Sequence, residues 1–271
     1  MDTRYISSLL SRVVLLAATT PALASDWTNS GGNAARNGQS AALGPIAATD
    51  VRWTTPSNTL ISWQPVTWGE RVFAVRQTGF PTSGGAANDA VVCWNLATGG
   101  EAWRVTLPFS GNTSQDWIAW IAGASNGVVY ASRSGNGASV AQKVYALNAA
   151  TGAELWRSTA TTTAGSYAGV VFAPGGDLIV ADFRNVTRIR ASTGPTAWRV
   201  ARLGSVSGNC GAAATASSVF IVDAISGGHS IKKLSMATGA LIAQSSVMSG
   251  FTAQNSPFLS PDGSTVYFAR S

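Results

Sequence analysis

The sequence predicts an all-β fold in which four-stranded units repeat around a ring, as the blades of a β-propeller do. Three observations lead to this prediction. A Thr-Gly pair returns four times in similar surroundings, at spacings of 53, 42 and 45 residues, which is the length of one four-stranded blade. Short runs of β-branched and aromatic residues are separated by Gly-rich turns, and no long helical pattern appears.

The clearest copy of the repeat is the segment 143–157, KVYALNAATGAELWR. Val144 and Leu147 favour a strand, Trp156 belongs to a second strand, and Gly152 stands where the connecting turn needs a positive φ. A Trp five residues after Thr predicts an aromatic that fills the space between adjacent blades, and Ala243 replaces it in the fourth copy. The structural repeat positions are Thr98, Gly99 and Trp103; Thr151, Gly152 and Trp156; Thr193, Gly194 and Trp198; Thr238 and Gly239.

This hairpin resembles the repeat of the quinoprotein-like (PQQ-like) β-propellers, whose blades end in a phrase close to VYALDAATGxxLWR. Residues 143–157 and 91–104 (VVCWNLATGGEAWR) are close to it, and residues 184–199 and 230–244 keep the Thr-Gly pair with fewer of the other positions. The resemblance implies the propeller fold and two kinds of function. The family contains calcium- and PQQ-dependent dehydrogenases as well as scaffold proteins without a cofactor.

Residues 1–24 have the features of a secretory signal peptide. Arg4 and Arg12 precede an apolar run, and Ala22-Leu23-Ala24 forms a small-x-small cleavage site before Ser25. The run is shorter than the roughly 20 residues that a membrane-spanning helix needs. No Cys follows the cleavage site, so a lipid anchor of the kind carried by the family's outer-membrane assembly scaffold is not expected. We therefore predict a periplasmic or secreted propeller domain over residues 25–271, without a transmembrane segment.

The remaining elements follow in chain order. Residues 26–40 resemble the opening that precedes many such propellers, and we expect them on the outside of the ring. Val51 and Trp53 are expected in a closing blade that joins the two ends of the domain, because closure removes exposed strand edges. Blades are predicted at about 61–108, 117–160, 166–203 and 209–248, and a fifth, incomplete blade begins at 256. We favour a fragment of a larger ring over an irregular last blade that borrows from the N-terminus, because an open ring would leave long unpaired edges.

Composition limits the classes of partner. Charged residues make up 11% of the chain, and its net charge of +6 comes mainly from scattered arginines. Lys232-Lys233 is the only basic pair on a predicted strand, whereas a nucleic-acid interface needs a clustered basic face. We therefore expect a monomeric protein with a protein or polysaccharide partner in the cell envelope and no nucleic acid.

The candidate binding residues lie in the loops that lead into the innermost strands, because these loops line one mouth of a propeller. They share aromatic rings and amides, which stack on and hydrogen bond to peptides or carbohydrates. The alternative for Trp63, Trp117 and Trp120 is packing within the blades. The candidates are Trp63, Gln64, Asp116, Trp117, Trp120, Tyr167, Asn209, Gln254 and Asn255.

Other patterns carry little chemistry. Ser125 is the centre of a Gly-x-Ser-x-Gly pattern, but a strand follows it, so a hairpin turn is predicted rather than a nucleophile elbow served by His229. Cys93 and Cys210 lie in blades that are not neighbours, which favours two buried thiols over a disulfide, and no ligand spacing for a metal surrounds them.

The sequence thus favours a non-enzymatic binding or scaffold propeller with no cofactor. The alternative is a fragment of a PQQ- and calcium-dependent dehydrogenase acting on alcohols or sugars. In the family's enzymes many cofactor sites include adjacent cysteines, and calcium is held by clustered oxygens. Cys93 and Cys210 are not adjacent, and the acidic residues of this chain are isolated from one another.

Overall fold

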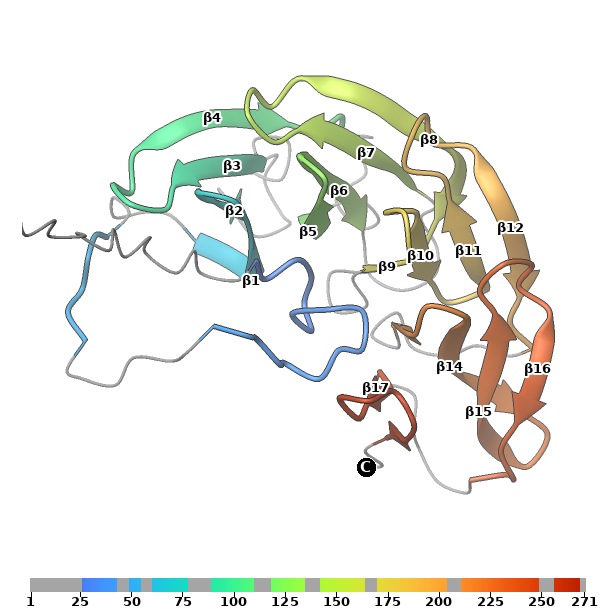
Figure 1. Cartoon of the computed structure of the whole chain (residues 1–271). Helices are drawn as coiled ribbons and strands as arrows, with labels where there is room; N and C mark the ends of the chain where they lie inside the picture. Colours follow the sequence, from blue (N-terminus) through green and yellow to red (C-terminus); the bar gives the residue numbers. More distant parts are fainter. Residues whose placement is uncertain are drawn as a thin grey trace, which may run out of the picture.

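A computed structural model of the chain contains β-strands and no helix among the residues that it describes. These residues are 26–42, 49–54, 60–77, 89–109, 118–134, 142–163, 170–203, 211–248 and 256–268. Four sheets of four strands and one sheet of two are arranged side by side around a common centre (Figure 1). The prediction of an all-β fold with four-stranded blades is confirmed.

Each blade is an antiparallel sheet whose strands are paired in chain order, with the first strand innermost (Figure 1). Blade one contains β1 (Leu60–Trp68), β2 (Arg71–Gln77), β3 (Ala90–Asn95) and β4 (Glu101–Thr106). Blade two contains β5 (Ile118–Ser125), β6 (Val128–Ser134), β7 (Gln142–Asn148) and β8 (Glu154–Thr162). Blade three contains β9 (Val170–Phe172), β10 (Leu178–Ala181), β11 (Asn185–Ile189) and β12 (Thr196–Ala201). Blade four contains β13 (Ala213–Ala214), β14 (Ser218–Ile225), β15 (Gly228–Ser235) and β16 (Leu241–Gln244), and the fifth sheet contains β17 (Phe258–Leu259) and β18 (Val266–Tyr267).

Apolar clusters between neighbouring sheets form the core. One cluster joins blades one and two through Phe73, Val91 and Leu147, and another joins blades three and four through Val171 and Ile221. The second strands are buried on both faces, which is why they read as continuous apolar runs rather than as an alternation. The fold is therefore a stack of sheets in which each blade is stabilised by its neighbours.

Residues 26–38 lie at the centre of the ring, and the expectation that they pack on its outside is wrong (Figure 1). The innermost strands have an unpaired edge, and this segment bonds to that edge in four of the five sheets. The backbone N–H groups donate over 2.8 to 2.9 Å, from Thr67 to Trp27, Ala124 to Thr28, Ala214 to Ala34 and Leu259 to Ala35. All four donors are near the ends of the innermost strands, at the mouth where β1 turns into β2. We call this end the turn mouth and the opposite end, where the chain enters β1, β5, β9, β13 and β17, the loop mouth.

Residues 50–54 are extended but form no strand. Val51 is exposed, whereas Trp53 packs its ring against Gly99 of blade one, and its indole N–H donates to the Leu96 carbonyl over 2.9 Å. Trp53 thus contacts blade one from the side on which a preceding blade would lie. The signal peptide predicted for residues 1–24 lies outside the described residues. The described residues contain no helix that is long and apolar enough to cross a membrane.

Candidate functional site

The contact between blades repeats with little variation. Each hairpin Gly has a φ between 70° and 84°, and the ring of a Trp that comes earlier in the chain lies where a Cβ would stand. The indole N–H donates to the carbonyl two residues before the Thr, from Trp53 to Leu96 (2.9 Å), Trp103 to Ala149 (3.0 Å), Trp156 to Ala191 (2.9 Å) and Trp198 to Met236 (2.9 Å). These tryptophans serve the packing of the blades, so they are not available as ligand-stacking residues.

Few of the candidate binding residues fall within the described part of the loop mouth. Gln64 is exposed in β1, beside a register shift between Ser62 and Val66. Trp120 is fully buried between blades two and three, which favours the packing alternative over a binding role, and its indole N–H has no hydrogen-bond partner among the described residues. Trp63 is on β1, but its side chain lies outside the described residues, as do Asp116, Trp117, Tyr167, Asn209, Gln254 and Asn255. Gln64 and Trp120 are therefore the two candidates whose side chains the structure describes.

A charged position that the sequence analysis missed lies near the loop mouth. In each blade the apolar residue four positions before the Thr, such as Leu147 in blade two, pairs with a residue of the second strand, here Val129. The charged residue comes four positions after that second-strand residue. Its occupants in blades one to four are Arg76, Arg133, Asp182 and Asp223. The last three are about 1% exposed, although charged side chains are seldom buried without partners.

Asp182 organises the connection between β10 and β11. Its Oδ1 accepts hydrogen bonds from the backbone N–H groups of Arg184 (2.8 Å) and Asn185 (2.6 Å), and its Oδ2 accepts from Thr163 N–H (3.1 Å). Thr163 follows β8 of the preceding blade. The carboxylate thus joins blade two to blade three, and it is satisfied by backbone donors as a buried carboxylate must be.

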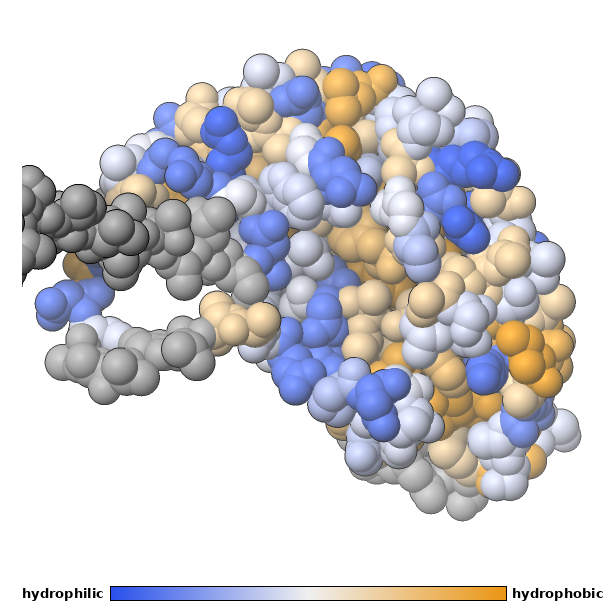
Figure 2. Space-filling model, in the orientation of Figure 1, coloured by the Kyte–Doolittle hydropathy of each residue, from blue (hydrophilic) through white to orange (hydrophobic). Residues whose placement is uncertain are grey.

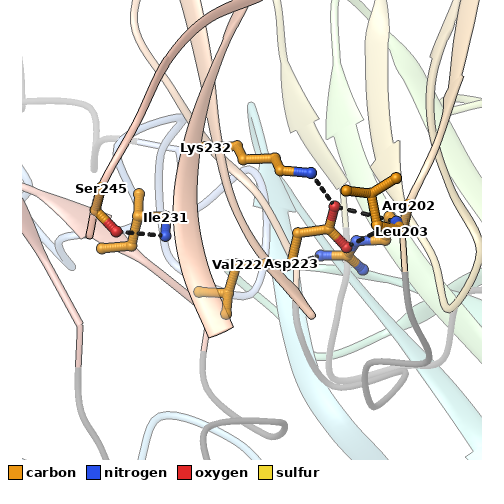
Figure 3. Close-up of polar contacts among 7 residues, drawn as sticks. All are labelled: Arg202, Leu203, Val222, Asp223, Ile231, Lys232 and Ser245. Carbon is orange, nitrogen blue, oxygen red and sulfur yellow. Dashed lines mark hydrogen bonds and ion pairs between the residues drawn. The ribbon is translucent and has the colours of Figure 1, made fainter. Parts of the chain in front are cut away.

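Asp223 has an equivalent role one blade later (Figure 3). Its Oδ2 lies 2.6 Å from Lys232 Nζ, and its carboxylate accepts the backbone N–H of Leu203, which follows β12. Arg202 donates to the carbonyl of Val222 over 2.7 Å and to that of Asp182. These buried ionic groups tie blade three to blade four, and no hydrolytic or redox arrangement is apparent among them.

The other candidate chemical groups are structural as well. Ser125 ends β5 next to Asn126, whose φ of 51° forms the tight turn into β6, and His229 pairs with Met248 in blade four. They lie in different blades, as the prediction of a turn requires. Burial raises the pKa of the Cys93 thiol, although Arg71 Nη1, 3.8 Å away, opposes the increase. Cys93 is a free, buried thiol in this structure, and Cys210 lies outside the described residues.

A hollow of 410 Å³ opens at the turn mouth between blades three and four. Arg188, Ser217, Ser235 and Met236 are among its lining residues. Arg188 is already bonded to Asp177 at 2.8 Å and to the Met236 carbonyl at 2.9 Å. The hollow therefore offers hydroxyl and backbone groups rather than an uncommitted charge.

Comparison with known proteins identifies the repeat. Residues 140–268 match the family described as outer membrane protein assembly factor BamB. Within these residues the chain has PQQ-like β-propeller repeats. A comparison with curated protein sequences finds no match.

Solved structures agree with the PQQ-like fold. Quinohemoprotein alcohol dehydrogenase from Comamonas testosteroni is 15% identical with a TM-score of 0.57, over 87% of this chain and 44% of that one. A europium-containing methanol dehydrogenase is 12% identical with a TM-score of 0.51, over 90% of this chain and 62% of that one. BamB from Moraxella catarrhalis is 16% identical with a TM-score of 0.45, over 76% and 57%. At such identities the likeness concerns the fold alone, and this chain spans only about half the length of these proteins.

Proposed function

We propose that this PQQ-like propeller is a non-enzymatic binding or scaffold module of the cell envelope, which holds a protein or carbohydrate at its loop mouth. The periplasmic or extracellular location belongs to the same proposal. The family description names an assembly factor for outer-membrane proteins, and we extend a protein-binding role of that kind to this chain. The segment 26–38 bonds to the inner strands near the turn mouth, and we therefore propose that a partner approaches from the loop mouth.

The observation that carries the proposal is that the buried carboxylates are already bonded to groups of the protein. Asp182 accepts three backbone N–H groups, and Asp223 accepts one and is paired with Lys232. A general acid or base needs a carboxylate that can exchange a proton with a substrate. These carboxylates instead join consecutive blades, which is the work of a rigid scaffold whose loops make the specific contacts.

The dehydrogenase alternative requires residues for calcium and PQQ. Calcium takes six to eight oxygen ligands, usually with several carboxylates. Among the described residues there is no group of three His, Cys, Asp or Glu side chains that could hold a metal ion. Asp182 and Asp223 serve separate blade junctions, so the described residues do not fit such a site.

Site-specific photocrosslinking can test the loop mouth. A photoreactive residue in place of Gln64 should give a discrete adduct with a protein or glycan from envelope extracts. The matched control places the same residue at Thr238, which is exposed in a hairpin turn at the turn mouth and should give none. The same adduct from both positions, or no adduct from Gln64 in a folded protein, would contradict the proposal.

A titration with PQQ and calcium separates the enzyme from the scaffold. Tryptophan fluorescence reports binding, and reduction of a dye with an alcohol or sugar reports turnover. The scaffold proposal expects neither saturable quenching nor dye reduction. Calcium-dependent quenching together with dye reduction would replace the proposal by the dehydrogenase alternative.

A further inference from the structure

The outer hairpin of blade three, β11 and β12 with their flanking residues, has an unusual charge distribution. Between Asp182 and Asp223 the chain contains five arginines and no acidic residue. Arg188 and Arg202 are bonded to Asp177 and to backbone carbonyls. The other three, Arg184, Arg190 and Arg199, are exposed, and their side chains make no hydrogen bond or ion pair with the described residues.

The other blades show what Arg199 lacks. Its counterparts Arg104 and Arg157 each form an ion pair of 2.6 Å with a Glu three residues earlier, Glu101 and Glu154. In blade three Thr196 stands in the place of that Glu. The guanidinium of Arg199 is therefore left without the carboxylate that its repeat position provides elsewhere.

Arg190 shows a second departure at the same hairpin. Its counterparts Asn95 and Asn148 use Oδ1 to accept two backbone N–H groups of the Thr-Gly turn, at 2.9 to 3.1 Å. In blade four the Ser235 hydroxyl accepts one such N–H group, that of Thr238, over 3.4 Å. An arginine has no acceptor, so the turn of blade three has lost this hydrogen bond and presents a cation instead.

The three arginines follow the length of the hairpin. Arg184 and Arg190 flank β11 (Asn185–Ile189), and Arg199 is paired with Thr187 at its middle. At about 3.3 Å per residue, the first two Cα atoms are about 20 Å apart. β12 is also the last strand of its sheet. The Thr196 N–H at its start donates to Thr159 Oγ1 of blade two (3.3 Å), but among the described residues no strand pairs with its outer edge.

We propose that this hairpin is a second interaction surface, which binds an extended acidic segment of a protein partner along β12. Carboxylates match the forked guanidinium groups. A polypeptide can also pair with the strand edge, which an anionic lipid or glycan cannot do by strand addition. Figure 1 shows β12 at the rim of the propeller, and Figure 2 shows the molecule from the same side. The surface lies on the rim of the propeller, and the inference is independent of binding at the loop mouth.

The test uses fluorescence anisotropy with a fluorescein-labelled peptide of alternating Glu and Thr. Arg199→Gln removes the charge, and Thr196→Glu restores the carboxylate found in blades one and two while keeping every arginine. Each should weaken binding about threefold, and the triple change Arg184→Gln, Arg190→Asn, Arg199→Gln about tenfold or more. The matched control, Arg104→Gln, lowers the net charge by the same one unit and should leave binding within about twofold.

Three results would overturn the proposal. The first is an equal loss with Arg104→Gln, which would indicate attraction by net charge alone. The second is an absence of saturable peptide binding by the folded protein at low salt. The third is binding to phosphatidylglycerol vesicles that depends on Arg184, Arg190 and Arg199 while the peptide remains unbound, which would assign the surface to a lipid. Thr196→Glu and Arg190→Asn restore residues found in sibling blades, so both variants are expected to fold.

Discussion

Gly152 lies directly beneath the indole ring of Trp103, so close that a Cβ added to it would stand 2.8 Å from ring atoms Cδ2 and Cε3. The same relationship links Trp53 to Gly99, Trp156 to Gly194 and Trp198 to Gly239. The Thr-Gly pair of the repeat thus meets two demands at once, a positive φ and the close approach of an aromatic ring. The first demand concerns the turn itself, and the second concerns the junction between two blades.

These two demands can be measured separately with glycines that share a φ of 75°. Gly127 has nothing within 4 Å of an added Cβ, whereas Gly152 meets Trp103. Gly127→Ala should lower the free energy of unfolding by about 1 to 2 kcal/mol through φ alone. Gly152→Ala should cost about 1 to 3 kcal/mol more because of overpacking. Urea denaturation measures both, and equal losses would show that the ring contact is not restrictive.

Removing the ring should leave a cavity between blades. Trp156 packs against Gly194 and against Tyr130, whose ring centroid is 5.7 Å away. We expect Trp156→Ala to lower the free energy of unfolding by about 3 to 5 kcal/mol. Thermal or urea denaturation measures the effect. A melting temperature equal to that of the parent protein would reject a packing role.

The indole hydrogen bond can be isolated by comparing two Trp→Phe substitutions. Trp156 donates to the Ala191 carbonyl, whereas the buried indole of Trp120 has no acceptor. Both substitutions remove similar volume, but only Trp156→Phe leaves a carbonyl without its donor. Trp156→Phe should therefore be the more destabilising by about 1 kcal/mol. A larger loss at Trp120 would mean that its N–H has a partner in solution.

The pair formed by Asp223 and Lys232 should be costly to break on one side only. Lys232→Met leaves a buried carboxylate, and we expect a loss of about 3 to 5 kcal/mol in the free energy of unfolding. The double variant with Asp223→Asn keeps an acceptor for the Leu203 N–H and should recover much of that loss. Glu154→Gln, which breaks an exposed pair with Arg157, should cost less than about 1 kcal/mol. Denaturation curves in which the single and double variants are equally unstable would contradict this expectation.

Alkaline stability should depend on Tyr130. Burial raises its pKa to about 12, and the Asp177 carboxylate adds to the increase. Since an unfolded tyrosine ionises near pH 10, the stabilisation from a neutral Tyr130 is complete below about pH 10 and disappears as the pH rises to about 12. The shift corresponds to about 2 to 3 kcal/mol. Urea denaturation from pH 9 to 12 should show this loss in the parent and a smaller one in Tyr130→Phe, and equal losses would refute the assignment.

The blades could be predicted from the sequence because each outer hairpin repeats apolar strand residues and a Gly with a positive φ, and three of the four also repeat a Trp. The charged position at Arg76, Arg133, Asp182 and Asp223 could not. Twelve residues separate β2 from β3 but only three separate β10 from β11, so these side chains do not recur at a fixed distance from the Thr. A comparison of the second strands alone would have revealed the signal.

The segment 26–38 was misplaced for a different reason. It is fixed by backbone hydrogen bonds to the ends of inner strands, and backbone pairing leaves no pattern in the side chains. The candidate binding residues could be chosen from their expected position in the loops. Whether each side chain lies at the surface or in the core depends on its burial, which the loop position does not give. Burial removed Trp120, whose neighbours in the sequence are apolar.

The central segment also has a consequence for the order of folding. Arg36 Nε donates to the carbonyl of Ala212, 176 residues later in the chain. Residues 34–36 meet their partners Ala212, Ala214 and Leu259 only after blade four and the fifth sheet have been synthesised. Each blade can form from local hairpins as it appears, but the closing contacts at the hub are distant in sequence and therefore slow to form. The contacts of residues 34–36 are thus the last to form although these residues are made among the first, and a chain interrupted before Leu259 would lack the bond between Ala35 and the fifth sheet.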